Sequence, residues 1–134
     1  MLLSKSSIER LLSDKVLLIT PSYEIKAASV KAYLSGLFGN DKDSLVQADT
    51  YTLKPKGFVL AKAREVLTLP KNIAAFYDGF VGVASLGLFT HGSSMFIDPG
   101  ETSQITLELF NASDKPIELR KDMRVGQYIF FQVG

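Results

Sequence analysis

Short runs of aliphatic, β-branched and aromatic residues follow one another along most of this chain, and Pro, Gly or charged residues interrupt them. Runs of this length between turn-forming residues are typical of strands. They predict strands over 16–20, 28–34, 57–61, 65–69, 73–77, 95–97, 104–111, 116–119 and 125–133. Many short strands joined by turns indicate an all-β barrel or jelly roll.

Two segments depart from the strand pattern. Ser6 and Glu9 have the spacing of a capping box, and apolar residues follow at helical intervals, so we expect a short N-terminal helix near 7–13. The segment 36–50 is polar and rich in turn-forming residues, which predicts a plain surface connection.

Composition limits the classes of protein that fit. The 134 residues correspond to one domain, 1–134, which is long enough to fold without disulfides. The absence of Cys excludes a thiolate metal site and favours a cytoplasmic protein. With 15 Lys and Arg against 14 Asp and Glu, we expect no nucleic-acid partner. No apolar run reaches the roughly 18 residues of a membrane span, and the first residues do not resemble a signal peptide, so we expect no membrane partner.

The stretch IDPGETSQITLELFN, residues 97–111, joins a tight turn to an alternating strand. Asp98 is followed by Pro and Gly, which reverse the chain direction. In the strand, a period of two sends Leu107 and Leu109 to one face and Glu108 to the other. A rigid element therefore holds one acid, which the strand pattern alone leaves open to two interpretations: a solvated carboxylate or a site residue.

Several motifs, in order and correctly spaced, resemble the dCTP deaminase branch of the dCTP deaminase/dUTPase family. They are the stretch above, SLGLFTH before it, IELRKDMRVGQYIFF after it, the FVLAKAREVLTLP hairpin and the early ASV strand. The resemblance implies a distorted β-barrel of dUTPase-like type and hydrolytic deamination of dCTP to dUTP in pyrimidine deoxyribonucleotide metabolism. It also implies a homotrimer with active sites between subunits, which suits the apolar stretch 128–131 as a strand covered on both faces.

The resemblance assigns roles to single residues. Family enzymes use a strand glutamate as general base and acid without a metal, and Glu108 stands in its place. A zinc-dependent deaminase is excluded, because the chain has no Cys and one His. The implied ligand is a deoxycytidine or deoxyuridine nucleotide, with no cofactor for deamination and Mg²⁺ only alongside a bound triphosphate. The implied substrate-binding residues are His91, Ser93, Ser94, Asp98 and Gln127.

The segment after Gly79 departs from the family pattern. Family enzymes carry Arg-Ser-Ser there and another Arg three residues on, which hold the triphosphate, whereas residues 80–85 read FVGVAS. Phe and Val cannot bind phosphate oxygens, so we expect weak binding of dCTP and dUTP. Glu101, where the family has an aromatic residue, adds a repulsive charge.

Two classes of function therefore stay open. The first is an enzyme, either a dCTP deaminase of reduced activity or a dUTPase-like pyrophosphatase. The second is a non-catalytic trimeric relative that acts as a binding or regulatory protein.

Overall fold

The computed structural model describes residues 1–93 and 95–134. These residues form two short helices, α1 (Lys5–Ser13) and α2 (Val81–Ala84), and a succession of strands. The strands are β1 (Leu18–Thr20), β2 (Val30–Gly39), β3 (Val46–Gln47), β4 (Thr50–Leu53), β5 (Phe58–Ala63), β6 (Val66–Thr68), β7 (Ile73–Gly79), β8 (Leu88–Phe89), β9 (Phe96–Ile97), β10 (Thr102–Ser103), β11 (Thr106–Asn111), β12 (Ile117–Arg120) and β13 (Arg124–Gln132).

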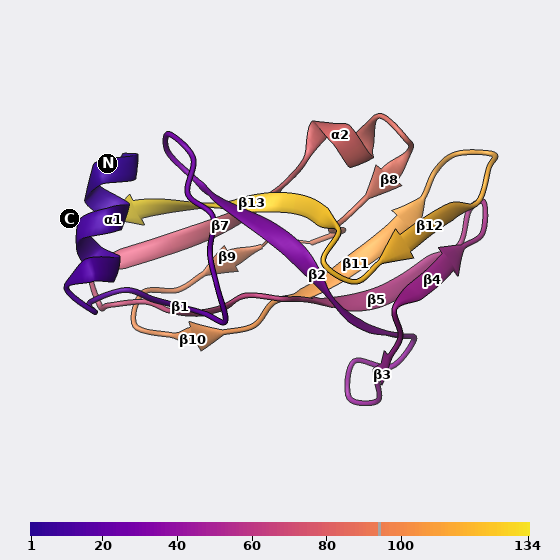
Figure 1. Cartoon of the computed structure of the whole chain (residues 1–134), viewed down its shortest axis with the longest axis horizontal. Helices are drawn as coiled ribbons and strands as arrows, with labels where there is room; N and C mark the ends of the chain where they lie inside the picture. Colours follow the sequence, from indigo (N-terminus) through magenta and orange to yellow (C-terminus); the bar gives the residue numbers. More distant parts are fainter. Residues whose placement is uncertain (94) are drawn as a thin grey trace.

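The strands form three antiparallel sheets. The largest has the order β8-β11-β5-β2-β13-β7-β9, with β3 added beside β2, and the smaller sheets are β1-β6-β10 and β12-β4. Figure 1 shows the large sheet curling, with α1 at the end where both termini lie and with β12 and β4 at the other end. The fold is therefore all-β with a barrel-like curl and a short N-terminal helix, as the sequence predicted.

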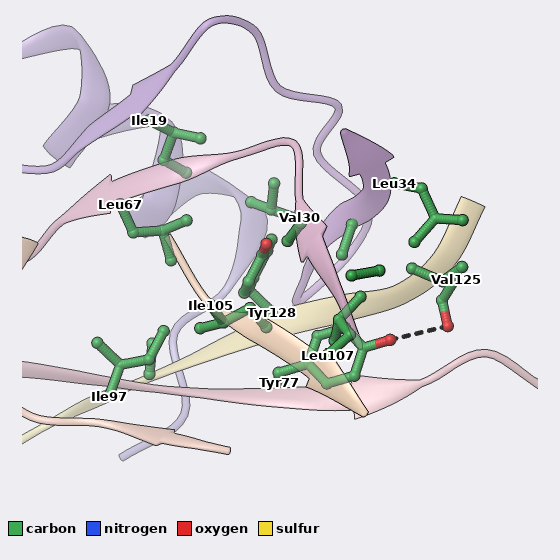
Figure 2. Close-up of a cluster of buried hydrophobic side chains, with 14 of the residues drawn as sticks. Ile19, Val30, Leu34, Leu67, Tyr77, Ile97, Ile105, Leu107, Val125 and Tyr128 are labelled. Carbon is green, nitrogen blue, oxygen red and sulfur yellow. Dashed lines mark hydrogen bonds between the residues drawn. The ribbon is translucent and has the colours of Figure 1, made fainter. Parts of the chain in front are cut away.

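The core lies between the large sheet and the three-stranded sheet. Ile19 and Leu67 from the smaller sheet belong to the same buried cluster as Val30 and Tyr128 from the large one, as Figure 2 shows. The alternation of buried and half-buried side chains along β2 and β11 places one face of each strand against this cluster. Each buried large side chain stabilises the fold by about 1.5–3 kcal/mol relative to exposure.

The N-terminal helix is confirmed, but its predicted cap is wrong. Helix α1 begins at Lys5, and its N-cap is Ser4, whose Oγ accepts a hydrogen bond from the Ser7 N–H at 3.3 Å. A hydroxyl at the N-cap satisfies one of the unpaired N–H groups of the first turn. The helix buries Ile8 completely, which holds it against the core.

The plain connection predicted over 36–50 is also wrong in part. Strand β2 continues to Gly39, two residues of the segment form β3, and β4 begins at its end. Gly36 has φ of +93°, and the pairing of β2 with β5 shifts register between Leu34 and Phe38. A glycine in the left-handed region lets a strand bulge and bend without ending.

None of the helices among the described residues is long and apolar enough to cross a membrane.

Candidate active site

A cavity of about 850 Å³, the main cavity below, lies where β5, β9, β10 and β11 approach the turn that follows β2. Its lining includes Glu108 and Ser93 together with Asn40, Asp41 and Lys42 of that turn. The volume falls within the range of small-molecule sites, about 300–1,000 Å³.

The turn at 98–101 has the predicted geometry. Gly100 has φ of +82°, and the Glu101 N–H lies 3.4 Å from the Asp98 carbonyl oxygen, as a type II turn requires. The Gly100 N–H also donates to the Pro70 carbonyl at 3.0 Å. These contacts fix the point at which the chain enters the strands that line the cavity.

Strand β11 presents Glu108 to the cavity while burying the residues on either side of it. Leu107 and Leu109 are fully buried, whereas Glu108 is half-buried and pairs across the sheet with Leu60 of β5. This is the alternation that the sequence predicted, and it follows from the period of two in a strand.

One oxygen of the Glu108 carboxylate is held by the neighbouring loop. Its Oε1 accepts hydrogen bonds from the Gly92 N–H at 2.9 Å, the Ser93 N–H at 3.1 Å and the Ser93 hydroxyl at 3.1 Å. No hydrogen-bond donor among the described residues contacts Oε2 of Glu108. The arrangement fixes the carboxylate in place and leaves one oxygen available to a ligand.

These hydrogen bonds favour the ionised form of Glu108. The Gly92 N–H, followed by the two Ser93 donors, holds the pKa of the Glu108 carboxyl below its ordinary value, although partial burial opposes this. The side chain is therefore ionised at neutral pH. An ionised carboxylate with a free oxygen can accept a proton from a water molecule.

The other predicted site residues do not gather around this cavity. Asp98 lies on the turn and Gln127 on β13, and neither is among the described residues that line the cavity. The Gln127 amide donates to Asp78 and to the Gly79 carbonyl, both at 3.2 Å. Ser94, which was also predicted to bind substrate, lies outside the described residues.

His91 is among the described residues that line a second cavity and is not among those that line the main one. Its Nδ1 is 3.2 Å from the Ser93 carbonyl oxygen, and its ring meets Tyr77 edge-on at 5.6 Å. It lines the second cavity, of about 480 Å³, which is enclosed by the end of β7, α2 and β8.

The second cavity contains the segment that departs from the family pattern. Phe80 and Val83 line it, and Val81 on α2 is 76% exposed. The Arg124 guanidinium stacks at 4.0 Å over the Phe80 ring and donates to Gln127 at 3.2 Å. The Arg124 guanidinium is thus already bound by Phe80 and Gln127.

Much of the main cavity was not predicted from the sequence. The turn residues 40–42, Leu60 and Met95 come from separate parts of the chain, and the motifs gave none of them a role in the site, although Leu60 lies in the FVLAKAREVLTLP hairpin. Within the described parts of the chain, no group of His, Asp and Glu side chains could hold a metal ion.

Comparison with known proteins places these features in context. The family model described as dCTP deaminase-like matches residues 39–133. Proteins named "dCTP deaminase, dUMP-forming" are 42% identical over 64% of this chain and 45% of the relative in a Nocardioides species, and 45% identical over 64% and 44% in Thermobifida fusca. The protein of that name from Tropheryma whipplei is 34% identical over 100% of this chain and 79% of its own length. The chain thus matches less than half the length of the first two relatives.

Solved structures agree in fold. A 2'-deoxycytidine 5'-triphosphate deaminase from Agrobacterium tumefaciens superposes with a TM-score of 0.81 at 19% identity, covering 99% of this chain and 48% of that one. The dUTPase of Staphylococcus bacteriophage 80alpha gives 0.66 at 13% identity, covering 90% and 92%. The barrel is therefore of the dUTPase-like type.

Proposed function

The chain belongs to the dCTP deaminase-like family, and on that premise we propose that it is a cytoplasmic hydrolytic deaminase of pyrimidine deoxyribonucleotide metabolism. The observation that carries the proposal is the position of Glu108, ionised and fixed at the wall of the main cavity with one oxygen open. The activity for which these relatives are named, deamination of dCTP, requires such a group.

The proposed reaction exchanges the amino group of cytosine for oxygen. A water molecule beside Glu108 loses a proton to the carboxylate as its oxygen bonds to the ring carbon that carries the amino group. Glu108 then returns the proton to the amino nitrogen, the carbon–nitrogen bond breaks, ammonia leaves, and the remaining hydroxyl proton moves to the adjacent ring nitrogen. Water and cytosine thus give uracil and ammonia, and the carboxylate is regenerated.

The neighbouring residues have supporting roles in this proposal. Ser93 donates two of the three hydrogen bonds that Glu108 Oε1 accepts, and these keep the carboxylate oriented. In the proposal, Asp98 fixes the turn that shapes the pyrimidine pocket, and His91, which lines the second cavity, and Gln127, which donates to Asp78 and Gly79, hold the protein around the site. The deamination needs no cofactor, and Mg²⁺ would enter only with a bound triphosphate.

A second candidate is a non-catalytic relative that binds a ligand or protein partner. The apolar α2 segment favours it, because Phe80 and Val81 offer no charged or hydroxyl group to a triphosphate. Each lost charged contact of this kind costs on the order of 1.5–3 kcal/mol.

Replacing Glu108 separates the two candidates. We expect Glu108→Gln to lower ammonia release from deoxycytidine, dCMP or dCTP by at least about 10²-fold, because an amide cannot take the proton. The amide oxygen can still accept from Gly92 and Ser93, so the free energy of unfolding should change by less than about 0.5 kcal/mol.

The matched control is Glu118→Gln, which alters an exposed strand glutamate paired with Arg120. It should leave both ammonia release and the melting curve unchanged. Wild-type protein that releases no ammonia from any of the three compounds would favour the non-catalytic candidate. Full activity in the Glu108→Gln variant would remove Glu108 from the mechanism.

A further inference from the structure

Two buried hydroxyl groups meet at the start of the loop 90–93, which holds the Glu108 carboxylate. The Tyr77 hydroxyl on β7 is hydrogen-bonded to Thr90 Oγ1 at 2.9 Å and to the Val125 carbonyl oxygen at 3.0 Å, and Figure 2 shows the second of these bonds. Tyr77 and Thr90 are 3% and 4% exposed. Because a buried polar group is costly to leave unpaired, these bonds hold Thr90 against β7 and β13.

Thr90 is also joined to Glu108 through the backbone. The Glu108 N–H donates to the Thr90 carbonyl at 3.2 Å, just beyond the end of β8. The loop then turns, so that the Gly92 and Ser93 N–H groups donate to Oε1 of the same glutamate at 2.9 and 3.1 Å. Thr90 is therefore the point from which these two N–H groups are held over the carboxylate.

The state of Glu108 depends on how accurately this loop is placed. The Gly92 N–H contributes most to lowering the pKa of the Glu108 carboxyl, and the Ser93 hydroxyl and N–H follow. Hydrogen bonds weaken steeply as their angle departs from the ideal, so a displaced loop stabilises the carboxylate less. Burial raises the pKa of the Tyr77 phenol, which therefore stays protonated throughout the range in which a carboxyl group titrates.

We propose that Tyr77 is a positioning residue for Glu108, which acts through Thr90 to keep the N–H groups of residues 92 and 93 directed at the carboxylate. The inference rests on the proposed function as far as deamination is concerned. The hydrogen bonds themselves join residues of one chain and are the same in every copy of it. Tyr77 is not among the described residues that line the main cavity, so its effect is carried by the loop.

Single hydroxyl groups can be removed with little change in shape. Tyr77→Phe keeps the ring, including its edge-on contact with His91 at 5.6 Å. Thr90→Val removes the other hydroxyl of the pair. The matched control is Tyr128→Phe, because this ring is also buried and lies 6.0 Å from the Tyr77 ring, but its hydroxyl donates to Glu65. Each tyrosine variant loses a buried hydroxyl, so both melting temperatures should fall by a similar amount, about 2–8 °C.

The charged and titratable side chains around Glu108 are the same in all these proteins. Those that line the main cavity or lie beside it are Asp41 and Lys42 of the turn after β2, Lys62 of β5, His91 of the loop, Glu101 of the 98–101 turn, and Lys71 next to Gly100. A difference between variants therefore reports the placement of the loop and not a change of nearby charge.

Carbon-13 NMR of protein labelled at the glutamate carboxyl measures the pKa of Glu108, whose signal is identified by its loss in Glu108→Gln. We expect this pKa to rise toward its ordinary value in Tyr77→Phe and in Thr90→Val, because the loop no longer holds its N–H groups on Oε1. The double variant should show no further rise, since both changes break the same hydrogen bond. Tyr128→Phe should leave the Glu108 signal unchanged and alter that of Glu65.

Ammonia release is the second measurement, made on whichever of deoxycytidine, dCMP and dCTP the wild type turns over fastest. We expect kcat to fall at least about fivefold in Tyr77→Phe while KM changes less, since a catalytic group misplaced by about 1 Å can cost about 10²-fold in rate. The acid limb of the kcat/KM profile should move to higher pH in this variant, following the pKa of Glu108. Tyr128→Phe should leave kcat and the profile unchanged.

The outcomes distinguish this inference from the proposed function. A Glu108 pKa that is the same in the wild type and in Tyr77→Phe overturns the inference and leaves the proposed deaminase standing. An equal rise in Tyr128→Phe also overturns it, because any loss of buried hydrogen bonding would then have the same effect. Wild-type protein that releases no ammonia contradicts the proposed function, and the NMR titration then still decides whether Tyr77 positions Glu108.

Discussion

The buried carboxylate of Glu65 ties three parts of the fold together through side-chain hydrogen bonds. Its Oε1 accepts from the Tyr33 N–H at 3.1 Å and from the Tyr128 hydroxyl at 3.2 Å, and its Oε2 lies 3.2 Å from the Arg64 Nε. The residue is fully buried, and this burial raises the pKa of its carboxyl despite the three donors.

A raised pKa in the folded state predicts how stability varies with pH. The folded protein holds the Glu65 proton more tightly than the unfolded chain, so this contribution is complete below the unfolded pKa of about 4.3 and is lost as pH rises through the folded pKa. Over that interval the wild type should lose stability relative to Glu65→Gln. Urea unfolding at a series of pH values measures this, and parallel curves for the two proteins would contradict it.

Single residues also show how much of the candidate site can be predicted from sequence. Period-two alternation was enough to place Glu108 on the opposite face from Leu107, because strand geometry is local. The convergence of the 40–42 turn and Leu60 on the same cavity depends on pairing between distant strands, which no local pattern encodes. The roles of the predicted site residues stay predictions.

Among the elements, strand β13 packs very closely against β7 at Gly126. A Cβ atom on Gly126 would lie 2.3 Å from the Asp78 carbonyl oxygen and 2.5 Å from the Tyr77 ring. Tyr77 is buried, and its hydroxyl donates to the carbonyl of Val125 at 3.0 Å, as Figure 2 shows. Gly126 is therefore needed for packing, because a residue without a Cβ lets β13 lie directly against β7.

We expect Gly126→Ala to destabilise the protein by about 1–3 kcal/mol or more, because the added methyl group forces backbone and ring apart. The matched control is Gly79→Ala, at the paired position of β7, where the nearest atom to the new Cβ would be 3.4 Å away. Thermal unfolding of both variants measures the difference. Equal melting temperatures would refute the packing argument.

Some helices and strands were predicted from the sequence more accurately than others, and the differences have physical reasons. Strands with several alternating positions, such as β5 and β11, were recognised within a few residues of their ends. The two-residue strands β8 and β10 carry too little pattern, and β3 was hidden in the polar segment 36–50. Helix α2 was missed because four apolar and glycine residues look like a strand or loop until tertiary contacts fix them.

For the molecule as a whole, the outer face of β7, β9 and β13 is unusually aromatic. Phe76 meets Phe96 at 5.0 Å and Phe131 at 5.8 Å between ring centroids. Phe76 and Phe96 are 39% and 43% exposed in the single chain. Contiguous exposed aromatic side chains often mark a protein interface. We propose this face as the contact between subunits of the expected homotrimer.

Light scattering coupled to size exclusion should therefore give a trimer at micromolar concentration. Phe76→Asp should shift the protein toward the monomer, because a carboxylate buried in an apolar contact is strongly unfavourable. Phe58→Asp, at a residue of β5 that is 52% exposed, is the matched control and should leave the assembly intact. A wild-type monomer would refute the proposal, and equal loss of assembly in both variants would refute the choice of face.

The sheet order also bears on how the chain behaves while it is being made. Strand β2 leaves the ribosome early, but its partner on one side is β13, from the other end of the described chain. At synthesis rates of about 5–20 residues per second, the delay is on the order of ten seconds. Throughout it, the nascent chain carries a long strand with one unpaired edge, which invites pairing with other chains. Low yield on expression would then reflect aggregation during translation rather than weakness of the finished fold.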